Sequence, residues 1–151
     1  MQKLAIGTVQ FGTDYGINSV AGQVKKKEVE RILSYAHSQG LDLLDTAPAY
    51  GNSEKVLGNS NIEDFKIVTK TRSFNNSKID PTKLKIIQND FSRSLKNLKR
   101  DSVYGVLVHN ANDLLRPGSE ILFNKLNDLK QEKKIKKIGV SVYDHIQLQS
   151  I

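Results

Sequence analysis

The stretch Leu41-Asp42-Leu43-Leu44-Asp45-Thr46-Ala47-Pro48-Ala49-Tyr50-Gly51 predicts the fold around it. Residues 41–44 form a short apolar run of the kind found in a buried strand. Asp45 stands where this strand ends, and Tyr50 lies in the loop that follows. The stretch therefore places a carboxylate and a phenol at the same end of one strand.

Two later apolar runs end on a titratable residue in the same way. Residues 67–69 lead to Lys70, and residues 106–108 lead to His109. Because the carboxyl ends of neighbouring parallel strands meet at one rim, we expect the four titratable side chains to lie close together. This rim is where a (β/α)8 barrel carries its active site.

The remainder of the chain alternates between strand and helix patterns. We expect strands at residues 4–7, 41–44, 65–69, 103–108 and 137–140, and helices at 25–39, 52–57, 81–98 and 119–129 and from 145 onward. This order predicts an α/β fold of parallel strands covered by helices. Residues 1–151 would form a single domain holding about five βα units of an incomplete TIM barrel, because a complete one takes about 250 residues.

Three finer expectations concern local structure. Residues 7–12, with a glycine at each end, are expected to form a turn, and residues 110–113 a loop. Glycine and asparagine predict a further loop through Gly16, Asn18 and Gly22. In the helix beginning at Asp80-Pro81, one side is expected to be buried. That side comprises Leu84, Ile87, Phe91, Leu95 and Leu98.

Composition and charge exclude several kinds of protein. The chain has no cysteine, so it has neither disulfides nor thiolate metal sites, and no His, Asp and Glu cluster indicates another metal site. No secretory leader or membrane-spanning run is visible, so a cytoplasmic protein that does not enter membranes is the default expectation. The formal net charge is +7, but the lysines are scattered over polar helix faces, so no nucleic-acid partner is expected.

Reduction of a carbonyl group suits the four residues at the rim. When hydride reaches the carbonyl carbon, a proton must reach its oxygen. A phenol with a pKa of about 10 is a poor donor at neutral pH, but a nearby ammonium stabilises the phenolate. Tyr50 would be the donor and Lys70 the ammonium, held and oriented by Asp45. His109 would assist proton delivery or position the substrate oxygen.

Five segments together make the chain resemble the aldo-keto reductase family, whose fold is a (β/α)8 barrel. They are Gly7-Thr8-Val9-Gln10-Phe11-Gly12, Leu43-Leu44-Asp45-Thr46-Ala47-Pro48-Ala49-Tyr50-Gly51-Asn52-Ser53-Glu54, Ile67-Val68-Thr69-Lys70-Thr71, Val106-Leu107-Val108-His109 and Ile138-Gly139-Val140-Ser141. The resemblance covers nearly the whole chain, and the segments in this order are far more specific than any one alone.

The resemblance implies a catalytic tetrad and a cofactor. In the family, the matching Asp, Tyr, Lys and His act together, with tyrosine as general acid and NADPH, less often NADH, as hydride source. Here the tetrad would be Asp45, Tyr50, Lys70 and His109, and it would act on a small carbonyl substrate. The sequence does not indicate which carbonyl compound is the substrate or which of the two cofactors is used.

The same resemblance implies cofactor contacts. Gly7, Thr8 and Asp45 would lie along the nicotinamide riboside, and Ser141 would hold the carboxamide. In many members the matching serine is followed by asparagine, whereas here Val142 follows. Cofactor contact at this point is therefore expected to be weaker or made differently.

The sixth to eighth strands of the family barrel have no counterpart in this sequence. We therefore expect an N-terminal portion of a longer reductase, inactive alone and without its cofactor's phosphate anchor. An open barrel leaves strand edges unpaired, which predicts self-association through the open edge.

Two other functions remain open at this point. The chain could be a nucleotide-binding or regulatory barrel module without turnover, which would bind a cofactor tightly and reduce no carbonyl. A nucleic-acid binder using the lysines would show affinity that falls steeply with salt.

Overall fold

The computed structural model describes residues 4–16, 22–75 and 78–151. Within these residues, five parallel strands form one sheet in the order β1-β2-β3-β4-β5. The strands are β1 (Ile6–Gly7), β2 (Leu43–Asp45), β3 (Lys66–Lys70), β4 (Val103–Val108) and β5 (Ile135–Val140). This sheet confirms the expected α/β architecture with five parallel strands of a barrel.

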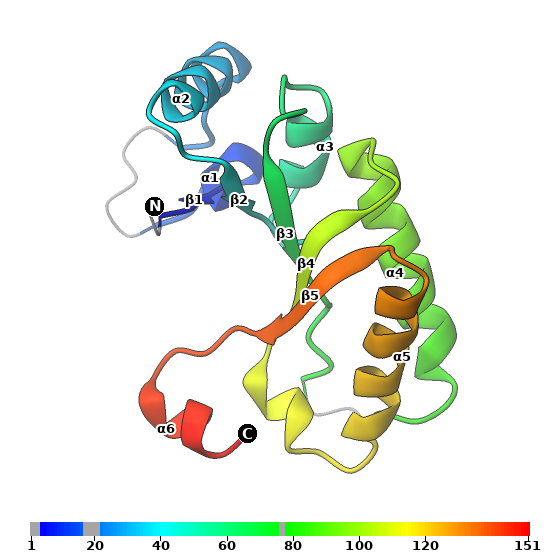
Figure 1. Ribbon diagram of the computed structural model, residues 1–151. Helices are drawn as coiled ribbons and strands as arrows, with labels where there is room; N and C mark the ends of the chain where they lie inside the picture. Colours follow the sequence, from blue (N-terminus) through cyan, green and yellow to red (C-terminus); the bar gives the residue numbers. More distant parts are fainter. Residues whose placement is uncertain (1–3, 17–21, 76–77) are drawn as a thin grey trace.

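Helices connect successive strands and cover the sheet. They are α1 (Val9–Gly12), α2 (Lys26–Ser38), α3 (Ser53–Gly58), α4 (Lys83–Leu98), the 3-10 helix η1 (Ala111–Leu114), α5 (Ser119–Gln131) and α6 (His145–Gln149). Figure 1 shows α3, α4 and α5 along one side of the sheet and α6 beyond the carboxyl end of β5. None of the helices in the described part of the chain is long and apolar enough to cross a membrane.

The long helices form where apolar residues recur at helical spacing. In α2 the buried residues are Val29, Leu33 and Ala36, and its charged residues face outward. Gly40 follows this helix with φ +74°, a conformation that glycine adopts without strain. In α5 the buried residues are Leu122, Leu126 and Leu129, as the pattern predicted.

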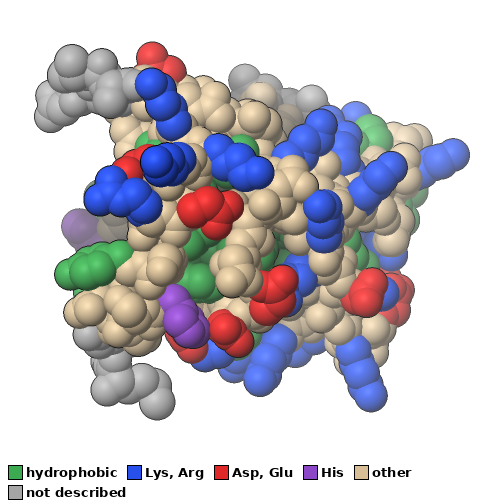
Figure 2. All heavy atoms as spheres, turned by 90° about the horizontal axis from the view of Figure 1, so that it is seen from above, with side chains coloured by type: hydrophobic (Ala, Val, Ile, Leu, Met, Phe, Trp, Pro, Cys, Tyr) green, Lys and Arg blue, Asp and Glu red, His purple; other side chains and the backbone are tan. Residues whose placement is uncertain are grey.

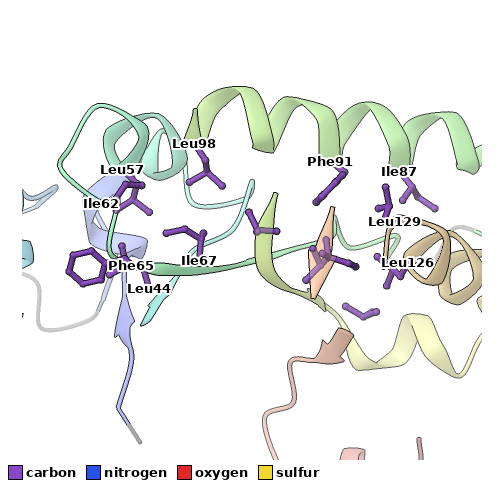
Figure 3. Packing of buried hydrophobic residues seen from close by; sticks show 14 of the residues in the cluster. Leu44, Leu57, Ile62, Phe65, Ile67, Ile87, Phe91, Leu98, Leu126 and Leu129 are labelled. Carbon is purple, nitrogen blue, oxygen red and sulfur yellow. The ribbon is translucent and has the colours of Figure 1, made fainter. Parts of the chain in front are cut away.

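The packed core lies between the sheet and these helices. Figure 3 shows Leu44 of β2 and Ile67 of β3 near Leu57 of α3 and Leu98 of α4, and Leu126 and Leu129 of α5 near Ile87 and Phe91 of α4. Leu44 and Leu57 are fully buried, and Ile67 and Leu98 nearly so. A buried side chain of this size contributes about 1.5–3 kcal/mol to stability. This layer holds the strands in register and so fixes the relative positions of their ends.

Three local expectations were wrong, and Asn18 of the expected loop lies outside the described residues. Residues 9–12 form α1, because the backbone N–H groups of Phe11 and Thr13 donate to the carbonyls of Thr8 and Val9. Residues 111–114 form η1, whose first turn is capped by the side chain of Asn110. Leu84 is 38% exposed. Its helix begins at residue 83, so Leu84 lies in the first turn, before the buried side of the helix starts.

The carboxyl ends of the strands gather the residues of interest at one rim. Asp45 is the last residue of β2 and Lys70 the last of β3, while His109 and Ser141 directly follow β4 and β5. The parallel register pairs β2 with residues 66–68 of β3, so β3 extends two residues further, to Lys70. β4 and β5 are aligned along their whole lengths. In Figure 1 β3, β4 and β5 run downward, so their carboxyl ends lie at the lower edge of the sheet.

Candidate active site

Asp45 and Lys70 form a close ion pair at the rim. The ammonium Nζ of Lys70 donates to Oδ1 and Oδ2 of Asp45 at 2.6 and 2.7 Å. It also donates to the backbone carbonyl of Thr46 at 3.0 Å. The Lys70 side chain is only 4% exposed, whereas that of Asp45 is 34% exposed. The ammonium is therefore held by three hydrogen bonds, and the carboxylate remains partly accessible to solvent.

Tyr50 lies against this ammonium. Its ring centroid is 4.9 Å from Nζ of Lys70. The half-buried ring also meets the imidazole of His109 edge-on, with the centroids 6.0 Å apart and the planes at 88°. The structure thus brings Asp45 and Tyr50 together with Lys70 and His109, which come from distant parts of the sequence.

His109 is held by its backbone and partly enclosed. Its N–H donates to the hydroxyl of Thr71 at 3.2 Å. The ring atom Nδ1 is buried and has no hydrogen-bond partner among the described residues. Burial, and then the positive charge of Lys70, lower the pKa of His109 below its usual 6.5. The neutral form of the imidazole is therefore favoured.

Removing the Lys70 charge should raise the pKa of His109. In Lys70→Met the repulsion from the ammonium is gone, and the attraction of the Asp45 carboxylate for an imidazolium is no longer offset. We expect the NMR titration midpoint of His109 to move upward. Lys66→Met, at the opposite end of the same strand, is the matched control and should leave it unchanged. A midpoint that does not move in Lys70→Met would contradict this arrangement of charges.

Close backbone contact holds the loop that carries Tyr50. Gly51 has φ +58°, and a Cβ there would lie 2.3 Å from the carbonyl oxygen of Gly12. A Cβ on Gly12 would lie 1.8 Å from the carbonyl oxygen of Tyr50. The N–H of Asn52 donates to the carbonyl of Gly12 at 3.2 Å. Glycine is thus required at both positions, because α1 and the Tyr50 loop meet backbone to backbone.

The whole sequence pattern and the fold agree with one known family. Residues 3–151 match the sequence model of the aldo/keto reductase family. The chain belongs to the aldo-keto reductase family. None of the curated proteins compared with it matches.

Solved aldo-keto reductases share this fold over most of the chain. A Pseudomonas aeruginosa protein assigned to the family is 34% identical, with a TM-score of 0.74, over 91% of this chain and 54% of its own. A family member from a Medee basin deep-sea metagenome library is 28% identical, with a TM-score of 0.58, over 84% of this chain and 46% of its own. The Bombyx mori aldo-keto reductase, solved in complex with NADP, shares the fold at 21% identity and a TM-score of 0.66, over 97% of this chain and 48% of its own. The chain spans about half the length of these relatives.

The three other residues with expected cofactor contacts lie in different surroundings. Gly7 is exposed, and a Cβ built on it would meet no atom within 4 Å. Ser141 is partly exposed, and its N–H donates to the carbonyl of Val108 at 2.9 Å. Thr8 is fully buried, and its hydroxyl lies 2.9 Å from the carbonyl oxygen of Asp45. Thr8 therefore supports Asp45 from inside the protein.

The sequence patterns did not single out the polar residues that support the tetrad. Thr46 holds Lys70 through its carbonyl, and Ser53 and Glu54 are buried at the start of α3. Glu54 accepts a hydrogen bond from the hydroxyl of Thr69 at 2.8 Å, beside Lys70 on β3. Residues 45–54 of this chain are unusually rich in polar side chains, and buried polar groups need hydrogen-bond partners. This concentration of polar residues was the sequence signal that could have identified the supporting residues.

The lysines are spread over the surface. Figure 2, which views the molecule from above Figure 1, shows Lys and Arg side chains across this face with acidic side chains among them. Several lysines and arginines of the described residues form ion pairs, including Lys66 with Asp42 and Arg31 with Glu28. Positively and negatively charged side chains are thus mixed on the surface of this aldo-keto reductase chain, which accords with polar faces exposed to solvent.

Proposed function

We propose that this chain carries the proton-donating part of an NADPH-dependent carbonyl reductase, with Tyr50 as general acid. One observation carries the proposal: the Lys70 ammonium is bound by both oxygens of Asp45 and lies 4.9 Å from the centre of the Tyr50 ring. A cation fixed beside a phenol stabilises the negative charge that the phenol acquires when it gives up its proton.

Each residue has a distinct role in this proposal. As negative charge develops on the carbonyl oxygen of a small aldehyde or ketone, the Tyr50 hydroxyl donates a proton to it. Lys70 stabilises the resulting phenolate, and Asp45 keeps the ammonium in place. The neutral imidazole of His109 offers an N–H that positions the substrate oxygen.

The residues at the rim fit a nicotinamide ring. The space above Gly7 is open, the Asp45 carboxylate is partly exposed, and Ser141 offers a hydroxyl at the end of β5. Gly7 and Asp45 would lie along the nicotinamide riboside, and Ser141 would hold the carboxamide. NADPH supplies the hydride when bound. The NADP in the Bombyx mori structure accords with this choice.

The proposal is tested by NADPH oxidation with a panel of aldehydes. Because the chain spans about half the length of its solved relatives, the assay compares residues 1–151 with a longer native polypeptide that contains them. We expect aldehyde-dependent oxidation by the longer polypeptide and no measurable rate for residues 1–151 alone. Tight binding of NADPH without reduction of any carbonyl would instead favour a nucleotide-binding module without turnover.

We further propose that residues 1–151 self-associate through the sheet edges. β1 and β5 form the two edges of the described sheet, and β5 exposes Lys136 and Lys137. Charged lysines on an edge strand oppose pairing with another chain.

Replacing Lys136 and Lys137 by alanine should strengthen this association. We expect a larger concentration-dependent mass in sedimentation for this double variant than for the unchanged chain. A double alanine variant of Lys26 and Lys27 on α2 removes the same charge away from the edge. Equal changes in both variants would show that net charge, and not the edge of β5, controls association.

A further inference from the structure

A buried group of hydroxyl residues lies directly behind the candidate active site. It consists of Thr8 after β1, Thr46 after β2 and Ser53 at the start of α3, each 0% exposed. Three separate elements thus meet through side chains that water does not reach. Buried hydroxyl groups are stable only when they are hydrogen-bonded, so their mutual geometry is tightly constrained.

Ser53 is at the centre of this group. Its Oγ lies 2.8 Å from the carbonyl oxygen of Thr8, 2.9 Å from the hydroxyl of Thr8 and 3.2 Å from the hydroxyl of Thr46. The Thr8 hydroxyl in turn lies 2.9 Å from the carbonyl oxygen of Asp45. The hydroxyl of one serine therefore ties the ends of two strands together.

The same serine also contacts the loop that carries the phenol. The backbone N–H of Ser53 donates to the carbonyl of Tyr50 at 3.0 Å. On the other side, the carbonyl of Thr46 accepts a hydrogen bond from Lys70 at 3.0 Å. Ser53 is thus bonded to the Tyr50 backbone and to the residue that holds the Lys70 ammonium.

We infer that Ser53 is a positioning residue, which sets the Tyr50 ring relative to the Lys70 ammonium. The catalytic meaning of this role rests on the function proposed above, whereas the geometric role does not. Ala49 and Gly51, on either side of Tyr50, are exposed, so neither adjacent residue anchors Tyr50 through a packed side chain. Without the Ser53 hydroxyl, those of Thr8 and Thr46 lose a buried partner, and α3 can shift with the loop.

The test measures the position of the Tyr50 ring in the unchanged chain and in Ser53→Ala. The edge-on contact between Tyr50 and His109, with centroids 6.0 Å apart, should give a nuclear Overhauser cross-peak between the two rings. We expect this cross-peak to be weakened or lost in Ser53→Ala. Ser60→Ala is the matched control. Ser60 follows the same helix, and its hydroxyl donates to the local carbonyl of Val56, at 2.9 Å.

A second pair of variants covers the case in which Ser53→Ala does not fold. Thr46→Val removes the hydroxyl that Ser53 contacts and keeps the carbonyl that holds Lys70, so it should also weaken the cross-peak. Thr46→Ser retains the hydroxyl and should restore it. An unchanged cross-peak in folded Ser53→Ala, or in both Thr46 variants, would overturn the inference. The measurement needs no turnover, so absence of reductase activity in the longer polypeptide would refute the proposed function and leave this result intact.

Discussion

Replacing Tyr50 by phenylalanine is expected to lower carbonyl reduction by about 10²- to 10⁴-fold, the usual contribution of a general acid. The experiment uses a polypeptide that contains residues 1–151 and oxidises NADPH with an aldehyde. Phenylalanine keeps the ring that packs against Lys70 and His109, and it removes only the proton donor. We therefore expect kcat to fall while NADPH affinity stays the same.

The exposed Tyr35 on α2 provides the control for this substitution. Tyr35→Phe removes an equivalent hydroxyl away from the rim and should leave the rate unchanged. Equal rates in the unchanged protein and in Tyr50→Phe would exclude Tyr50 as the acid. Loss of NADPH binding in Tyr50→Phe would instead show that the phenol is needed to hold the cofactor.

Replacing Asp45 by asparagine is expected to lower the free energy of unfolding by about 3 kcal/mol at pH 7. Breaking a buried ion pair leaves an uncompensated charge, which typically costs about 3–5 kcal/mol. The Lys70 ammonium is nearly inaccessible to water, while Asp45 is about one-third exposed. The Thr46 carbonyl and the new amide oxygen still accept hydrogen bonds, so we expect the lower end of that range. Urea denaturation of residues 1–151 measures the change.

Asp42→Asn is the matched control for Asp45→Asn. Asp42 pairs with Lys66 near the opposite end of β3, where both side chains are about half exposed. Water and salt screen such a pair, so its removal should change stability little. A similar loss of stability in both variants would show that burial of the Lys70 ammonium is not the reason for the effect.

The spacing of apolar residues within each segment predicted most of the fold, because it reflects which side chains of that segment are buried in the core. The spacing of Leu122, Leu126 and Leu129 identified α5, and the apolar residues 103–108 coincide with β4. Boundaries were less accurate where tertiary contacts set them. β5 begins at Ile135, two residues before the predicted start, because Ile135 pairs with Val103 and is buried.

The candidate site could be predicted only in part. Strand ends located Asp45, Lys70 and His109, because parallel strands bring their carboxyl ends to one rim. Tyr50 was located by its position in the loop after β2. The hydrogen bonds that Thr8 makes inside the protein could not be predicted from the sequence, because its partners Asp45 and Ser53 are distant in the sequence.

The sequence by itself determined the alternation of strands and helices, and with it which titratable residues stand at strand ends. Both are properties of short segments, since burial of apolar side chains has a period that can be read locally. Only the tertiary structure decided that the Lys70 ammonium contacts both the Asp45 carboxylate and the Tyr50 ring, and that Ser53 supports them from behind. Those contacts depend on strand register and backbone approach between α1 and the Tyr50 loop, which arise only when distant segments pack together.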